Sequence, residues 1–129
     1  GKGGIGKSTI VSNLSAYYSL NGEKVLQIGC DPKHDSSRPF LSGISPVTII
    51  DLLLKNSGKD PSPEDFLMNT DFGVSCIEVG GPEPGIGCAG RGILKMFELL
   101  EKFKLIDSKY DYVFYDVLGD VVCGGFAMP

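Results

Sequence analysis

The chain has 129 residues, of which 42% are hydrophobic and 22% charged, and its formal net charge is -4. This length fits a single domain with one core. An acidic balance without any Lys/Arg-dense run argues against nucleic acid as a partner, because such binding depends on neutralising phosphates. No apolar run approaches the roughly 18 residues that span a bilayer, and no signal segment opens the chain. We therefore expect a cytoplasmic protein with no nucleic-acid partner and no membrane partner.

The predicted helices and strands alternate along the chain. Apolar residues at helical spacing predict a helix from about Ser8 to Leu20, with Gly22 as its C-terminal cap. The patterns that follow predict, in order, a strand at 24–29, a helix at 48–56, a helix start at 62–66, a strand at 73–79, a helix at 91–105 and a strand at 110–117. This alternation predicts an α/β fold with a mostly parallel sheet flanked by helices.

Both ends of the chain lie next to glycine-rich segments. Gly1 opens a phosphate-binding motif that normally follows a strand, and Pro129 comes directly after a second glycine-rich stretch. The chain also has no initiator methionine, and three strands are few for a parallel sheet. We expect residues 1–129 to be one partial domain that lacks the first strand and the C-terminal half of a longer protein.

The opening "GKGGIGKS" satisfies the pattern G-x-x-x-x-G-K-[ST] of a P-loop, which predicts a P-loop NTPase. In this motif backbone N–H groups surround the phosphates, Lys7 reaches the terminal phosphates, and Ser8 binds Mg²⁺. The helix that follows at once adds the positive end of its dipole, which a merely flexible glycine terminus would not provide. We expect ATP and Mg²⁺ to bind at Gly1, Gly3, Gly4, Gly6, Lys7, Ser8 and Thr9.

Four aspartates lie where strands are predicted to end. Asp116 ends the last predicted strand, where a carboxylate reaches Mg²⁺ or orders its water, and Asp120 lies four residues on in a loop near the γ-phosphate. Asp31 and Asp35 follow the first predicted strand, where Asp31 would orient the attacking water and Asp35 would approach Mg²⁺. The alternative for this second pair is an ordinary turn rich in Asp-Pro and Asp-Ser signals.

Two of the four cysteines lie in glycine-dense segments. Cys88 and Cys123 have glycine neighbours that allow the backbone to approach a sulfide, whereas Cys30 and Cys76 lie at a strand end and within an apolar strand. Two thiolates do not complete the four-thiolate shell of a [4Fe–4S] cluster, but a twofold axis doubles every ligand near it. For Cys30 and Cys76 we expect buried inert thiols, which also remain the alternative for the other pair.

The segments "GKGGIGKST", "GCDPKHDS", "GGPEPGIGCAGRG" and "YDVLGDVVCGGFAMP" together resemble the nitrogenase iron protein family. The resemblance implies a homodimer in which Cys88 and Cys123 of both subunits hold one [4Fe–4S] cluster. It also implies that Lys2 reaches across to the partner's nucleotide and that Asp116 and Asp120 link nucleotide state to the cluster. Arg91 resembles the arginine that is ADP-ribosylated in some members.

In that family, ATP hydrolysis is coupled to electron transfer. The resemblance therefore implies an oxidoreductase that takes electrons from ferredoxin or flavodoxin and passes them to a larger molybdenum-iron-type nitrogenase component. His34 and "VLQIG" are closer to the ATPase subunits of dark protochlorophyllide reductase and of the nickel-tetrapyrrole reductase, although Arg91 argues against the former. A more distant alternative is a redox-inert partitioning or metal-insertion ATPase, but those proteins lack this cysteine pair.

Overall fold

The computed structural model describes residues 6–30, 35–81, 90–107 and 109–117. Every predicted helix and strand is present, with bounds that differ from the prediction by three residues or fewer. The short strand β2 and the 3-10 turn η1 have no counterpart in the prediction. The elements are α1 (Lys7–Leu20), β1 (Val25–Cys30), η1 (Arg38–Phe40), α2 (Ile49–Lys55), α3 (Pro63–Phe66), β2 (Met68–Asn69), β3 (Val74–Glu78), α4 (Gly90–Lys102) and β4 (Tyr112–Val117).

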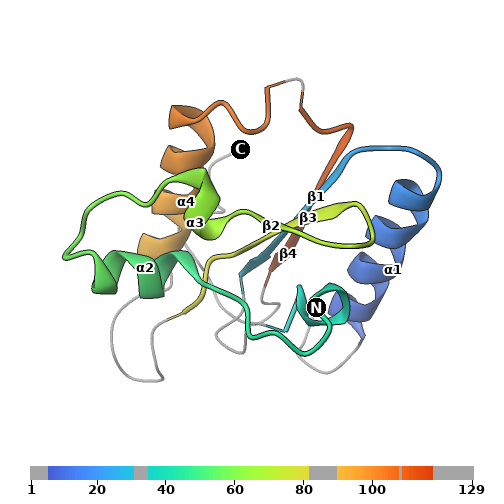
Figure 1. The fold of residues 1–129 in the computed structure, drawn as a ribbon, viewed down its shortest axis with the longest axis horizontal. Helices are drawn as coiled ribbons and strands as arrows, with labels where there is room; N and C mark the ends of the chain where they lie inside the picture. The colour runs from blue at the N-terminus through green and yellow to red at the C-terminus, as the bar shows by residue number, and fades with distance from the viewer. Residues whose placement is uncertain (1–5, 31–34, 82–89, 108, 118–129) are drawn as a thin grey trace.

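The strands form one sheet in the order β2-β3-β1-β4. Strand β1 is parallel to both β3 and β4, and only the two-residue β2 is antiparallel. Helix α1 covers one face of this sheet, and α2, α3 and α4 lie on the other (Figure 1). The expected mostly parallel α/β architecture is therefore confirmed, and it brings the carboxyl ends of β1, β3 and β4 to one edge.

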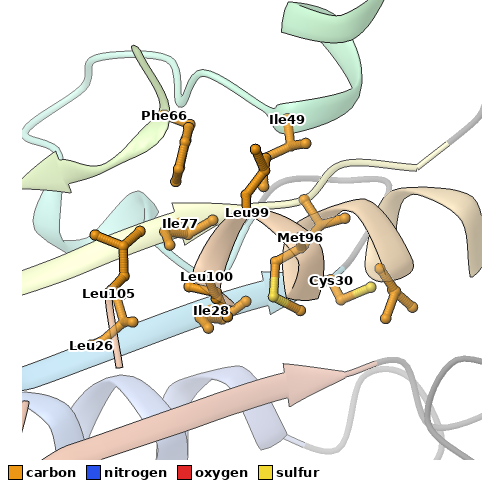
Figure 2. Packing of buried hydrophobic residues seen from close by; sticks show 12 residues of the cluster. Leu26, Ile28, Cys30, Ile49, Phe66, Ile77, Met96, Leu99, Leu100 and Leu105 are labelled. Carbon is orange, nitrogen blue, oxygen red and sulfur yellow. The ribbon is translucent and has the colours of Figure 1, made fainter. Parts of the chain in front are cut away.

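The main core lies between the sheet and helices α2 to α4. Successive residues of a strand face opposite sides, so Leu26, Ile28 and Cys30 point toward these helices (Figure 2). The amphipathic pattern of α4 is confirmed, because Ile93 and Leu100 are buried on its inner face. The buried residues of this cluster are Leu26, Ile28, Cys30, Ile49, Phe66, Ile77, Val79, Ile93, Met96, Leu99, Leu100 and Leu105.

Helix α1 packs on the opposite face with an unexpected side toward the sheet. Tyr18 stacks on Tyr112 of β4 with ring centroids 4.2 Å apart. Of the apolar residues that predicted this helix, Ile10, Leu14 and Tyr17 are exposed. The buried residues of α1 are instead two serines, Ser12 and Ser15, and Ser12 accepts a hydrogen bond from Gln27 of the sheet.

No helix among the described residues is long and apolar enough to cross a bilayer.

Candidate nucleotide site

Helix α1 begins at the end of the predicted phosphate-binding loop. Gly6 precedes it with φ +84°, in the left-handed region that glycine adopts without steric cost, and its carbonyl accepts the first helical hydrogen bond from the Ile10 N–H at 3.0 Å. No acidic residue occupies the first turn of the helix. The exposed N-terminal end of α1 is therefore electrostatically suited to an anion such as phosphate.

Lys7 and Asp116 meet at the carboxyl edge of the sheet. The Lys7 Nζ lies 3.7 Å from Oδ1 of Asp116, whose side chain is only 3% exposed, whereas that of Lys7 is 32% exposed. Asp116 belongs to β4, so the pair connects the P-loop helix to a strand more than a hundred residues later in the sequence. The fold therefore brings the P-loop lysine and the strand-end carboxylate side by side.

Asp35 lies on the segment that links β1 to η1. Its Oδ1 pairs with Nε of Arg38 at 3.3 Å, and both side chains are substantially exposed. Arg38 is thus solvent-facing and has a carboxylate partner. An exposed pair of this kind contributes little to stability and separates easily, so the Asp35 carboxylate is accessible to a ligand.

The two described cysteines lie in the core on opposite faces of the sheet. Cys30 packs among the residues facing α2 to α4, and Cys76 packs with Val25 and Val74 on the face of α1. Burial, followed by the charge of nearby Glu78, raises the pKa of the Cys76 thiol from 9.0 to about 12. Cys76 therefore stays protonated at neutral pH. The expected burial of both thiols is confirmed, and their lack of reactivity stays a prediction.

A buried polar cluster at the same sheet edge has no counterpart in the sequence-based prediction. Gln27 of β1 and Glu78 of β3 are almost completely buried and bind the backbone or side chains of Ser36 and Ser37. The signal available in the sequence is a glutamine and a glutamate inside otherwise apolar strands, since long polar side chains are rarely buried without partners.

Comparison with known proteins places this geometry in a family. The family model described as "4Fe-4S iron sulfur cluster binding proteins, NifH/frxC family" matches residues 1–129, which is the whole chain. The chain belongs to this family. The expected resemblance is therefore confirmed.

One relative and two solved structures illustrate the similarity. The chain is 54% identical over 129 residues to the nitrogenase iron protein of Methanospirillum hungatei, covering 100% of this chain and 45% of that protein. It therefore spans about half the length of this NifH/frxC relative. The septum site-determining protein MinD of Pyrococcus horikoshii, complexed with Mg-ADP, aligns with a TM-score of 0.66 and 25% identity over 98% of this chain and 49% of that one.

Cobyrinic acid a,c-diamide synthase of Mycobacterium smegmatis, solved with an ATP analogue and magnesium, aligns with a TM-score of 0.63 and 24% identity. The alignment covers 91% of this chain and 48% of that chain. This likeness concerns the fold alone, and together with MinD it confirms a P-loop-type α/β fold for this NifH/frxC member.

Several predicted site residues lie outside the described residues. These are Gly1, Lys2, Gly3, Gly4, Asp31, Cys88, Asp120 and Cys123, together with Lys33 and His34. Within the described part of the chain, no three His, Cys, Asp or Glu side chains gather in a way that would hold a metal ion. Arg91 is exposed in the first turn of α4, and Ser8 and Thr9 lie in the first turn of α1.

Proposed function

We propose that this protein couples MgATP hydrolysis to electron transfer from a [4Fe–4S] cluster, as a nitrogenase iron protein. The observation that carries the proposal is the pairing of Lys7 with buried Asp116 beside the start of α1, in a chain that belongs over its full length to a cluster-binding family. The 54% identity to a nitrogenase iron protein supports this branch of the family.

In the proposed nucleotide site the P-loop backbone and Lys7 bind the phosphates. Ser8 and Asp35 contribute oxygen atoms to the Mg²⁺ site, and Asp116 orders its water. Asp31 orients the attacking water. The remaining P-loop residues, Gly1, Gly3, Gly4, Gly6 and Thr9, supply backbone groups that fit closely around phosphate oxygens.

In the proposed cluster site Cys88 and Cys123 supply the thiolates. The positions of the other two cysteines support this choice. Cys30 and Cys76 are buried on opposite faces of the sheet, so they are poor candidates for ligands of one shared cluster. Two cysteines from each subunit of a homodimer complete the four-thiolate shell. When bound, the cluster supplies one-electron redox chemistry, and the protein supplies its ligands and its distance from the partner proteins.

The remaining roles concern coupling and partners. Lys2 of each subunit completes the partner's nucleotide site, and Asp120 connects the γ-phosphate to Cys123, three residues further on. The proposed donor is ferredoxin or flavodoxin, and the acceptor is the larger catalytic metalloprotein of nitrogenase. ADP-ribosylation of Arg91 would block docking of that acceptor.

The test measures iron in the full-length protein, purified without oxygen, and in three cysteine variants. We expect about four iron atoms per dimer in the parent protein and in Cys30→Ala, and none in Cys88→Ala or Cys123→Ala, because each of these two changes removes half of the ligands. Cys30→Ala is the matched control because it removes a thiol from the core. A full iron complement in Cys123→Ala would overturn the proposed cluster site.

A further inference from the structure

Residues 36 and 37, directly after Asp35, are held by buried polar groups from three different elements. The first of these groups is Gln27 of β1, whose Nε2 donates to the Ser36 carbonyl at 2.9 Å and to Ser36 Oγ at 2.8 Å. Ser12 of α1 donates from its Oγ to the same carbonyl at 3.3 Å. Gln27 and Ser36 are each 1% exposed. The backbone at Ser36 is therefore tied to both the sheet and the P-loop helix.

Glu78 holds the next residue from the end of β3. Its Oε1 accepts hydrogen bonds from both the backbone N–H and the Oγ of Ser37, each at 2.7 Å. Glu78 is 0% exposed and Ser37 is 1% exposed. Hydrogen bonds to a carboxylate are stronger than those between neutral groups, and buried ones are not weakened by water. Glu78 thus holds Ser37 by two short, buried hydrogen bonds.

Hydrogen bonds and close packing hold the end of β3 in place, and with it the backbone of Glu78. The Val79 N–H donates to the Gly29 carbonyl of β1 at 2.9 Å, and the Val79 carbonyl accepts from the Ile50 N–H at 3.1 Å. Gly80 follows with φ +80°, and a Cβ on it would lie 2.9 Å from Thr48. Neighbouring elements therefore hold β3 on both sides where its buried glutamate projects.

This network sets the spacing between two groups of the proposed Mg²⁺ site. Ser12 lies one helical turn after Ser8, and Ser36 directly follows Asp35. The Ser12–Ser36 contact and the Glu78–Ser37 contact therefore fix Asp35 relative to the start of α1. Gly6, Lys7 and Ser8, the P-loop residues that the structure describes, are not partners in these contacts.

We propose that Glu78 is a positioning residue that acts through Ser37 to hold Asp35 in the geometry needed for magnesium-nucleotide binding. This inference rests on the proposed function, because the ligand is the magnesium complex of a nucleoside triphosphate. It assigns a role to a buried carboxylate that lies outside the P-loop and outside the strand of Asp116. The proposal therefore predicts that replacing Glu78 lowers the affinity for ATP bound to magnesium and leaves the affinity for metal-free ATP unchanged.

The experiment measures the Kd of the full-length protein for ATP in excess Mg²⁺ and for ATP in EDTA. We expect Glu78→Ala to weaken MgATP binding by about tenfold, because the Ser37 donors lose a buried acceptor, and to change binding of metal-free ATP by less than about twofold. Val74→Ala on the same strand is the matched control. It removes buried apolar atoms from β3, and we expect both affinities to stay unchanged.

Two further variants keep the test decisive if Glu78→Ala does not fold. Ser37→Ala removes one of the two donors, and we expect about a threefold weakening specific to MgATP. Glu78→Gln retains an oxygen that accepts from the Ser37 N–H, so we expect it to recover most of the affinity. Where Glu78→Ala does fold, the losses in the double variant Glu78→Ala/Ser37→Ala should not add, because both changes break the same contact.

The possible outcomes separate this inference from the proposed function. Equal losses of MgATP and metal-free ATP affinity in Glu78→Ala and Ser37→Ala would overturn the positioning role, since they would indicate general disturbance of the fold. Unchanged MgATP affinity in both variants would overturn it too. A parent protein that binds no MgATP would overturn the proposed function along with the inference.

Discussion

Glu78 and Asp116 lie in one row across the sheet, because each is in register with Gly29 of the strand between them. Residues in register on parallel strands face the same side, so both carboxylates project toward the face that α1 covers. Asp116 pairs with Lys7 of α1, and Glu78 binds Ser37 beside Asp35. The row thus connects the P-loop helix and the Asp35 segment to the same edge of the sheet.

Gly29 is the position in this row where any side chain would collide. A Cβ there would lie 2.4 Å from Oε2 of Glu78 and 2.5 Å from the Cβ of Ser36. We expect Gly29→Ala to lower the free energy of unfolding by about 1–3 kcal/mol through overpacking, measured by urea denaturation, and also to weaken MgATP binding. Gly43→Ala is the comparison variant: no atom lies within 4 Å of its Cβ, but its φ of +84° is strained for alanine, so we expect it to lower stability through the backbone alone and to leave MgATP binding unchanged. MgATP affinity equal to that of the parent in Gly29→Ala would contradict this account.

Removing the charge of Asp116 should weaken the binding of the magnesium–nucleotide complex. Asp116→Asn keeps the shape of the side chain but leaves Lys7 without a carboxylate partner at 3.7 Å. We expect MgATP affinity to fall by about tenfold or more, measured by calorimetry on the full-length protein. Asp51→Asn, an exposed carboxylate in the first turn of α2, is the control and should bind MgATP normally. Normal binding by Asp116→Asn would argue against a role for this strand end.

The Cys76 thiol provides a test based on pH. Its pKa rises from 9.0 to about 12 in the folded state, so the unfolded protein loses its proton first as pH increases. The contribution of the protonated Cys76 thiol to the free energy of unfolding is therefore fully present below about pH 9, and it is lost as the pH rises toward 12. We expect the free energy of unfolding of the parent protein to fall more steeply over this range than that of Cys76→Ala. Identical slopes would show that this thiol ionises equally in both states.

A related measurement uses chemical reactivity. At pH 8 iodoacetamide should leave Cys76 unmodified in the folded protein and modify it in urea, because only the thiolate reacts and burial also blocks access. Mass spectrometry of the Cys76 peptide reports the outcome. Rapid modification of the native protein would be incompatible with the packing of Cys76 against Val25 and Val74.

Coupling between nucleotide and cluster is tested at Asp120. Asp120→Glu adds one methylene and keeps the charge, so we expect both MgATP and the cluster to remain bound. If this residue transmits the nucleotide state, chelation of cluster iron by bipyridine should lose its acceleration by MgATP. The comparison is between chelation rates with and without saturating MgATP in the variant and its parent. The same acceleration in both proteins would reduce Asp120 to an ordinary turn residue.

Much of this protein is determined by local sequence. The spacing of Ile93 and Leu100 predicts α4 and its buried face, and the short apolar runs predict β1, β3 and β4, because hydrophobic periodicity is set by local geometry. The P-loop pattern likewise predicts a helix directly after Gly6, where the structure begins α1. Chemistry carried by contiguous residues, such as a phosphate-binding loop, is visible without a tertiary structure.

Other features were decided only when distant segments came together. The exposed Ile10, Leu14 and Tyr17 show that apolar spacing does not identify the inner face of α1. One of its two buried serines, Ser12, instead contacts Gln27 of β1 and the Ser36 carbonyl. In the same way, nothing near Glu78 in sequence indicates that its carboxylate binds Ser37, 41 residues earlier. A buried polar residue is stabilised only by the partners that the fold brings to it, so its role becomes visible only in three dimensions.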